Sequence, residues 1–262
     1  MRILLTNDDG ITAPGLAALR TALRRLGDVV TVAPESEQSA VGHAITLHSP
    51  LRVHTASTAA DGVAYAVNGT PADCVKIALA ELLDDPPDLV ASGVNLGPNT
   101  GVSVFYSGTV SAAFEGALMG IPSIAVSLNT FEEPDFRPAA AVGARLAAMI
   151  LSEGLPDGVF LNVNVPSLPW ADLRGVRVVR QALSRFVESY HRRQDPRGRE
   201  YFWLDGYLEP LEPADDTDVV ALEQGYVSIT PLRADLTHPE LARELAERDL
   251  AQLLGGDADP AS

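Results

Sequence analysis

The sequence places two adjacent aspartates, Asp8 and Asp9, where a first strand gives way to a first helix. The apolar run at residues 1–5 is typical of a buried strand, and the apolar spacing of residues 16–26 predicts an amphipathic helix. A second apolar run follows at residues 29–33. A strand, a helix and a strand in this order predict a parallel pair with a right-handed crossover. This pattern predicts an α/β fold.

The alternation of strand and helix patterns continues to about residue 175. It predicts further strands at residues 51–54, 63–67, 88–92, 122–128 and 159–165, and helices at residues 71–83, 107–120 and 139–151. This order indicates a mostly parallel sheet flanked by helices. The turn after the first strand lacks the Gly-x-Gly-x-x-Gly pattern of dinucleotide-binding folds, and the two aspartates stand in its place.

The pattern changes after about residue 175. Strands are predicted at residues 176–180, 219–222 and 226–230, and a last helix at residues 239–254. Residues 184–205 hold two aromatic arms around a charged tip with Pro196 and Gly198, which indicates a projecting hairpin. The aromatic arms favour a subunit contact. We expect one domain over residues 1–254, with its core at about 1–175 and an oligomerisation extension at about 176–254, and a disordered tail at 255–262.

Composition limits the partners of the chain. The 262 residues are 46% hydrophobic, which allows a substantial core. A net charge of −16 disfavours a polynucleotide or an anionic membrane as partner, whereas a helix N-terminus still permits a small phosphorylated ligand. The single cysteine, Cys74, excludes an internal disulfide, and no apolar run reaches the roughly 18 residues of a membrane span. The chain enters a strand directly, so we expect no signal peptide and a cytoplasmic location.

Two interpretations of Asp8 and Asp9 stay open on the residues alone. Ligands of open α/β sheets bind at the carboxyl ends of the strands, and a hard divalent cation would relieve the repulsion between adjacent carboxylates. Aspartates also cap helices and shape turns. In the polar loop that follows the second strand, Ser39, His43 and His48 fit ordinary loop residues, because no zinc-type spacing is present.

A glycine-rich stretch at residues 92–101 carries Asn95 and Asn99 at the end of another strand. Glycine lets the backbone approach a ligand, and an asparagine carbonyl is a neutral ligand for a hard cation. Asparagine and glycine are also the common residues of plain turns. The residues by themselves therefore permit either a ligand site or a turn here.

The helix predicted at residues 107–120 begins with Ser107, Gly108 and Thr109. Free backbone N–H groups, the helix dipole and two hydroxyls make such a start an anion site, although an ordinary N-cap shares these features. Glu115, about two turns further on, is expected to face solvent or to pair locally. At the earlier helix, Thr70 is expected to act as an N-cap.

Five stretches together resemble one family. They are residues 3–10, 33–39, 92–97, 106–113 and 227–232. In these stretches the chain is similar to the SurE-type survival proteins, which are metal-dependent 5′/3′-nucleotidases. The resemblance implies a Rossmann-like α/β fold with a C-terminal β-hairpin and helix extension that exchanges elements between the subunits of a homodimer or homotetramer. It also implies one divalent ion, Mg²⁺ or Mn²⁺, for each subunit.

The resemblance assigns roles to particular residues. It implies metal ligands at Asp8, Asp9, Ser39 and Asn95, and phosphate-binding residues at Asn99, Ser107, Gly108 and Thr109. The reaction implied is hydrolysis of nucleoside 5′- and 3′-monophosphates, with Asp8 favoured over Asp9 to orient the water. Base and sugar preference, physiological metal and short polyphosphate as substrate stay open. A different metal hydrolase would want histidine ligands, which the first four stretches lack, whereas a non-catalytic nucleotide sensor remains an alternative.

Overall fold

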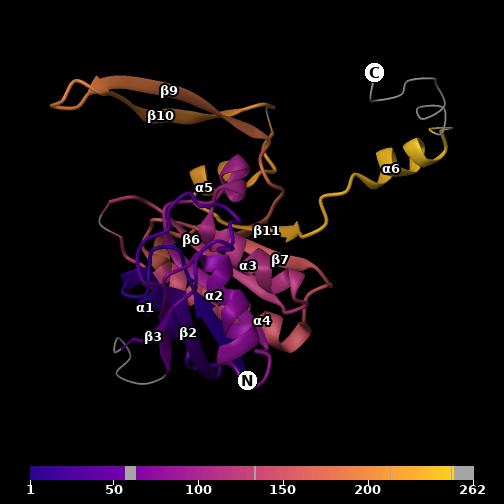
Figure 1. The fold of residues 1–262 in the computed structure, drawn as a ribbon. Helices are drawn as coiled ribbons and strands as arrows, with labels where there is room; N and C mark the ends of the chain where they lie inside the picture. The colour runs from indigo at the N-terminus through magenta and orange to yellow at the C-terminus, as the bar shows by residue number, and fades with distance from the viewer. Residues whose placement is uncertain (57–62, 133, 213, 249, 251–262) are drawn as a thin grey trace.

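The computed structural model describes residues 1–56, 63–132, 134–212, 214–248 and 250 (Figure 1). Within these residues, nine strands form one sheet in the order β3-β4-β2-β1-β5-β6-β7-β11-β8, and β9 and β10 form a separate hairpin. The strands from β4 to β7 run parallel, while β3 and β11 are antiparallel to their neighbours β4 and β7. The mostly parallel α/β sheet expected from the sequence is confirmed.

The elements of the body follow the predicted order. The strands are β1 (Arg2–Thr6), β2 (Asp28–Pro34), β3 (Val53–Thr55), β4 (Ala64–Val67), β5 (Leu89–Leu96), β6 (Ser123–Asn129), β7 (Val159–Pro166) and β8 (Val176–Val178). The helices are α1 (Pro14–Leu23), α2 (Pro71–Ile77), α3 (Gly108–Leu118) and α4 (Arg137–Glu153). A π-helical turn at Ala78–Leu82 extends α2, and 3₁₀ turns lie at Gly101–Phe105 and Trp170–Asp172.

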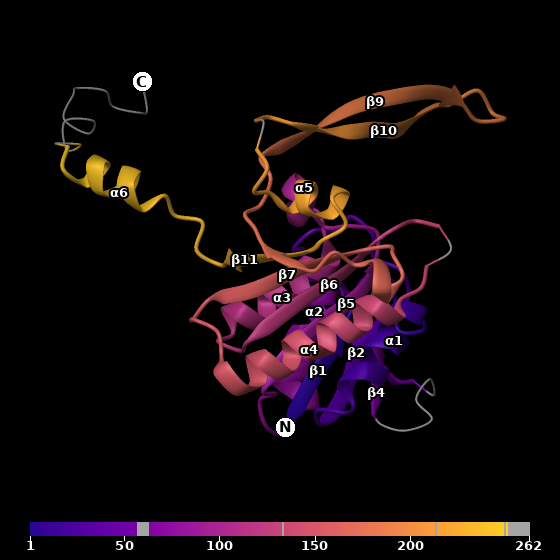
Figure 2. The same cartoon turned by 180° about the vertical axis from the view of Figure 1, so that it is seen from behind.

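Helices cover both faces of the sheet. Helices α1 and α4 pack together on one face, which Figure 2 shows in front, and α2 and α3 pack on the other. Side chains of β1 pack on both faces of the sheet. Ile3 and Leu5 belong to the hydrophobic cluster under α1 and α4, whereas Leu4 belongs to the cluster under α2. A strand buried on both faces is a near-continuous apolar run, which is why residues 1–5 predicted it.

The run at residues 219–222 is a helix, and the prediction of a strand there is wrong. Helix α5 (Asp218–Glu223) buries Ala221 and Leu222, and the following strand β11 (Val227–Arg233) pairs with β7 and β8. A short apolar run does not distinguish a strand from a buried helical turn by its periodicity. The buried Asp218 carboxylate accepts hydrogen bonds from distant backbone N–H groups, a tertiary constraint that no local pattern reveals.

The predicted hairpin at residues 184–205 is present and longer. Strands β9 (Ser184–Gln194) and β10 (Glu200–Pro210) pair along their whole length, and they extend beyond the body in Figures 1 and 2. Helix α6 (Pro239–Ala246) starts where predicted, but it ends earlier than residue 254 and stands away from the body. The expected tail at residues 255–262 lies outside the described residues. No helix in the described part of the chain is long and apolar enough to cross a membrane.

Candidate active site

Most of the candidate ligand residues meet at one edge of the sheet. Asp8 and Asp9 follow β1, Asn95 lies near the end of the adjacent β5, and Ser39 lies in the loop after β2, the other neighbour of β1. A cavity of about 690 Å³ opens here, and its walls include Asp8, Asp9, Ser39, Asn95, Asn99 and Ser107. Six of the eight site residues expected from the sequence therefore share one cavity, and Gly108 and Thr109 lie beside Asp8.

The aspartates do not cap the following helix. The N-cap position of α1 is Ala13, and no side-chain hydrogen bond caps this helix. The buried Asp8 carboxylate instead accepts a hydrogen bond from the Thr109 hydroxyl of α3. Close approach between Asp8 and α3 depends on Gly108, because a Cβ at that position would lie 2.8 Å from Asp8 Cβ. The start of α3 thus holds Asp8 in one orientation.

Burial and like charge act on the carboxylates together. Burial raises the pKa of Asp8 above its ordinary value, although hydrogen bonds from Thr109 oppose this shift. Burial also raises the pKa of Asp9 to about 6, with the nearby charges of Asp8 and Glu37 as further causes. Among the described residues that line this cavity there is no lysine or arginine. A bound cation would favour ionisation of both carboxylates, so this pair fits a cation site.

Two neutral oxygens complete a donor set for a hard cation. The Asn95 amide Nδ2 donates to the carbonyl oxygens of Gly97 at 2.8 Å and Leu96 at 3.3 Å, which leaves its carbonyl oxygen as the atom for a ligand. The exposed Ser39 hydroxyl donates to Glu37, and its oxygen retains lone pairs. In the described ranges, no group of three or more His, Cys, Asp or Glu side chains is placed to hold a metal ion. The donor set therefore combines two carboxylates with two neutral oxygens, and Mg²⁺ and Mn²⁺ bind such oxygen ligands.

Asn99 is fixed by a buried polar network that sequence reasoning missed. Its backbone N–H donates to Asn164 Oδ1 at 2.7 Å, and its side-chain amide donates to Ser127 Oγ at 2.8 Å. Its carbonyl oxygen accepts from Asn162 Nδ2 at 2.8 Å. The sequence pattern that could have indicated this network is the presence of Ser127, Asn162 and Asn164 within the apolar strands β6 and β7. A buried polar group needs a hydrogen-bond partner.

The hydroxyls of Ser107 and Thr109, at the start of α3, make different contacts. Ser107 lines the cavity and caps α3, because its Oγ accepts from the Val110 N–H at 3.1 Å. A capping hydroxyl still has its own proton to donate. Thr109 is fully buried, and its hydroxyl is directed to Asp8. Ser107 thus lies at the wall of the cavity, whereas Thr109 contacts the candidate cation ligand Asp8.

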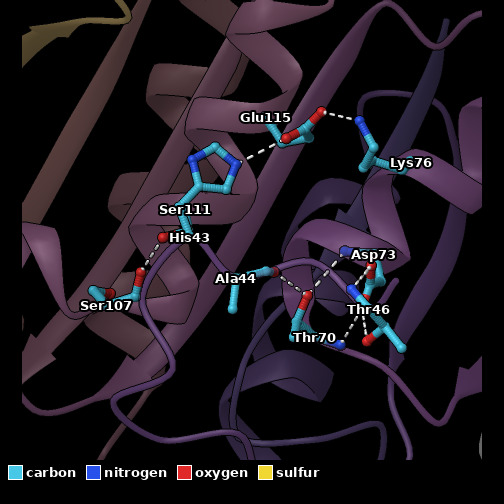
Figure 3. A network of polar contacts seen from close by, with 9 residues as sticks. All are labelled: His43, Ala44, Thr46, Thr70, Asp73, Lys76, Ser107, Ser111 and Glu115. Carbon is cyan, nitrogen blue, oxygen red and sulfur yellow. Dashed lines mark hydrogen bonds and ion pairs between the residues drawn. The ribbon is translucent and has the colours of Figure 1, made fainter. Parts of the chain in front are cut away.

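The loop that carries Ser39 is held to α3 through Glu115 (Figure 3). Glu115 was expected to face solvent or to pair locally, and this expectation is wrong, since the residue is 5% exposed. Its carboxylate accepts from His43 Nε2 at 2.8 Å and from Lys76 Nζ at 3.0 Å. These partners lower the pKa of Glu115, with the His43 hydrogen bond as the largest cause.

The same loop has two further attachments. Gln38 N–H donates to the Asp8 carbonyl oxygen at 2.8 Å, directly before Ser39. Further along, the Thr46 backbone and hydroxyl both donate to Asp73, at 3.0 and 2.6 Å (Figure 3). Asp73 also completes the capping box of α2 with Thr70, so the predicted Thr70 cap is confirmed. Attachments on both sides of Ser39 restrain the loop against the sheet edge.

The root of the hairpin is bonded to the glycine-rich loop at Gly101. The Asp218 carboxylate accepts from the backbone N–H of Gly101 at 2.9 Å and of Ala182 at 3.0 Å. Gln181 Nε2 donates to the Gly101 carbonyl oxygen at 2.7 Å. Gly101 has a φ of +52°, and a Cβ there would lie 2.5 Å from Ser184 Oγ, so a side chain would separate the two segments.

The hairpin also contributes directly to the cavity. Its wall includes Phe186, Glu188, Tyr190 and Leu204, together with Phe131 from the loop after β6. The sequence had assigned this segment to a subunit contact alone. Alternation along each arm was the signal that it has two different faces.

Comparison with known proteins identifies close relatives over nearly the whole chain. The family model described as "Survival protein SurE" matches residues 3–188. A protein of Syntrophobacter fumaroxidans named 5′-nucleotidase SurE is 54% identical over 95% of this chain and 100% of its own length. A protein of the same name from Moorella thermoacetica is 52% identical over 94% of this chain and 95% of its own. The solved structure of the SurE protein from Aquifex aeolicus is similar with a TM-score of 0.81 and 41% identity, covering 94% of this chain and 98% of that one.

Proposed function

This chain belongs to the survival protein SurE family, and we propose that it is a divalent-metal-dependent nucleotidase. Relatives named 5′-nucleotidase, about half identical over most of the chain, support a phosphoric monoester hydrolase. We assign nucleoside 5′- and 3′-monophosphates as substrates and nucleoside and phosphate as products. Short polyphosphate is a further candidate substrate.

One observation carries the proposal. The adjacent carboxylates of Asp8 and Asp9 share a cavity with Ser107, the N-cap residue of α3. Asp8, Asp9, Asn95 and Ser39 would hold one Mg²⁺ or Mn²⁺ ion for each subunit. Such an ion, when bound, polarises phosphoryl oxygens and lowers the pKa of a bound water.

The residues of the chain supply binding and orientation. The backbone N–H groups at the start of α3 and the Ser107 hydroxyl bind the phosphoryl group and stabilise the charge that develops on it. Asn99 lines the same cavity and is held in place by its buried network. We assign Asp8 to orient the attacking water and accept its proton, because the Thr109 hydrogen bond fixes its carboxylate.

We further propose that the chain acts as a homodimer or homotetramer in the cytoplasm. The distal hairpin exposes Trp203 and Tyr207, and the projecting α6 exposes Leu241 and Leu245. Large apolar side chains gathered on projecting elements mark surfaces that a second copy can bury. Single-stranded nucleic acid is an unsuitable partner for a chain with a net charge of −16.

Release of phosphate from p-nitrophenyl phosphate and from AMP, with and without Mn²⁺, tests the proposal. We expect release from both that requires the metal and stops when a chelator is added. A nucleotide sensor would bind AMP without release, and a deacetylase would release no phosphate from either compound. Long single-stranded DNA should be hydrolysed more slowly than AMP, since the cavity is compact and the surface acidic; faster hydrolysis of DNA would contradict the substrate assignment.

A further inference from the structure

The hairpin has two faces with different surroundings. Side chains alternate along a strand, and residues paired across the hairpin share a face. Tyr190 pairs with Leu204 and Phe186 pairs with Leu208, so these residues lie on the face that lines the candidate active site. Trp203, paired with His191, and Tyr207, paired with Val187, lie on the opposite face. The inward face is thus part of the cavity wall, while the outward face is available to a second subunit.

The cavity is divided by polarity. At the sheet edge its wall consists of the carboxylates, Asn95 and Ser107, whereas the hairpin side contributes Phe186, Tyr190 and Leu204. Phe131 joins the apolar side from the loop after β6. A ligand whose phosphate lies at the start of α3 would therefore direct its remaining part towards aromatic and aliphatic side chains. Pockets that combine an apolar wall with a few polar groups are typical of small-molecule sites.

We infer that Phe131, Phe186, Tyr190 and Leu204 form a base site, which holds the nucleobase of the substrate. The inference rests on the proposed nucleotidase function and names the part of the cavity that distinguishes a nucleotide from other phosphate monoesters. Tyr190 is 64% exposed, Phe131 75% and Leu204 56%, so each has a large apolar surface for a ligand to cover. Aromatic rings bind bases of any identity by stacking, because every base has a π face.

Phe131 is tied to the candidate cation ligands. Gly97 has a φ of +105°, and a Cβ at this position would lie 2.4 Å from Phe131 Cε1, so the ring rests directly on the Gly97 backbone. The carbonyl oxygen of Gly97 in turn accepts from the Asn95 amide at 2.8 Å. One short loop therefore positions both a wall of the base site and a candidate cation ligand.

Glu188 lies on the same inward face of the hairpin as Tyr190, two residues away. Its carboxylate accepts hydrogen bonds from ribose hydroxyls or from exocyclic amino groups, which are donors. The same charge repels a second phosphate at this end of the cavity. The base site is therefore suited to a nucleoside with one phosphate, at the far end from the hairpin.

A second subunit is the competing occupant of the inward face. The geometry favours the nucleobase, because the inward face opens into the cavity that holds Asp8, Asp9 and Ser107. The outward face carries its own exposed aromatic set, Tyr201, Trp203 and Tyr207, which a subunit can cover without closing the cavity.

AMP and ribose 5-phosphate separate the base from the rest of the substrate, because they share the sugar and the phosphate. With saturating Mn²⁺ we expect the wild-type kcat/KM for AMP to exceed that for ribose 5-phosphate roughly tenfold or more, within the range of base–aromatic stacking. Phe131→Ala and Tyr190→Ala should each raise KM for AMP about 5- to 20-fold, with kcat within about twofold. Neither should change the kinetics with ribose 5-phosphate. Tyr190→Phe, which keeps the ring, should behave as the wild type.

Trp203→Ala is the matched control, since Trp203 lies next to Leu204 but on the outward face. It should leave the AMP and ribose 5-phosphate kinetics unchanged. Equal losses on both substrates in Tyr190→Ala would overturn the base site in favour of a structural role, as would unchanged AMP kinetics in both alanine variants. Equal wild-type activity on AMP and ribose 5-phosphate would also overturn the base site, although the protein would still be a phosphatase. Loss of oligomer mass in Tyr190→Ala, measured by light scattering, with Trp203→Ala unaffected, would assign the inward face to the second subunit instead.

Failure of the proposed function gives a different result, namely no phosphate release from either compound by the wild type. Calorimetric binding of AMP and ribose 5-phosphate then tests the base site by itself. Tighter binding of AMP, lost in Tyr190→Ala and retained in Trp203→Ala, would support the site. Equal binding of the two compounds would refute it.

Discussion

The two ends of the cavity are built in opposite ways. At the sheet edge, Asp8 is buried and held by Thr109, and Asn99 is held by β6 and β7. At the hairpin end, Tyr190 and Leu204 are exposed and stand on a two-stranded element outside the main sheet. Groups that act on the reacting atoms need a fixed geometry, which packed elements provide. Groups that only cover a ligand tolerate mobility, so substitutions at the two ends should affect kcat and KM differently.

The largest effect should come from Asp9→Asn at the fixed end. Asparagine keeps the size and one oxygen but removes the charge that binds a hard cation. We expect a folded protein whose activity falls by roughly 10² or more, the scale of losing a main electrostatic element of a site. Manganese titration by calorimetry and turnover at saturating metal measure this, with Asn95→Ala and Ser39→Ala expected to weaken metal binding less. A variant that binds Mn²⁺ and turns over like its parent would remove Asp9 from the site.

A smaller loss of turnover should follow Thr109→Val, which replaces the hydroxyl with a methyl group. The Asp8 carboxylate would lose the partner that orients it, and misplacement of a catalytic group lowers the rate. We expect kcat to fall on the order of tenfold with KM for AMP nearly unchanged. Thr109→Ser, which keeps the hydroxyl, is the matched control. A kcat equal to that of the wild type in Thr109→Val would show that Asp8 needs no such support.

The Glu115 attachment should appear in the pH dependence of stability. His43 and Lys76 hold the folded pKa of Glu115 below its ordinary value of 4.5. The stabilisation is therefore present above pH 4.5 and is lost as the pH falls through the folded pKa. We expect Glu115→Gln to lower the free energy of unfolding by about 1.5–3 kcal/mol at pH 7, the usual contribution of a hydrogen bond to a charged group, and by less near pH 3. Urea unfolding at both pH values measures it, and an equal loss at both would contradict the ionic contribution.

The smallest effect on turnover should come from removing the distal hairpin, residues 187–207. The body would keep every residue at the sheet edge, so kcat for ribose 5-phosphate should stay within about threefold, since distant sites are nearly independent. The mass of the oligomer in light scattering should fall, because the outward aromatic face is lost. A monomeric wild-type protein would refute the subunit contact, and a collapse of kcat would show that the two ends are not separable.

The sequence predicted the sheet edge better than it predicted the contacts between elements. The resemblance to the SurE family assigned Asp8, Asp9 and Asn95 to one site. The strand pattern agrees with this assignment, because the carboxyl ends of parallel strands meet at one edge of the sheet. Glu115 was misplaced because its partners His43 and Lys76 are 72 and 39 residues away. The strand predicted at 219–222 failed because four apolar residues fit either structure. The cavity wall on the hairpin required the register between β9 and β10, which depends on how the whole hairpin packs.

Hydrogen bonds at Gly101 connect the root of the hairpin to the segment that carries Asn99. Asp218 holds the backbone of Gly101 and of Ala182 with one carboxylate, and Gly101 lies two residues after Asn99. The root of the hairpin and the segment that carries Asn99 are therefore joined at one buried carboxylate. These hydrogen bonds therefore set where the hairpin leaves the body relative to Asn99, whatever covers the distal part of the hairpin.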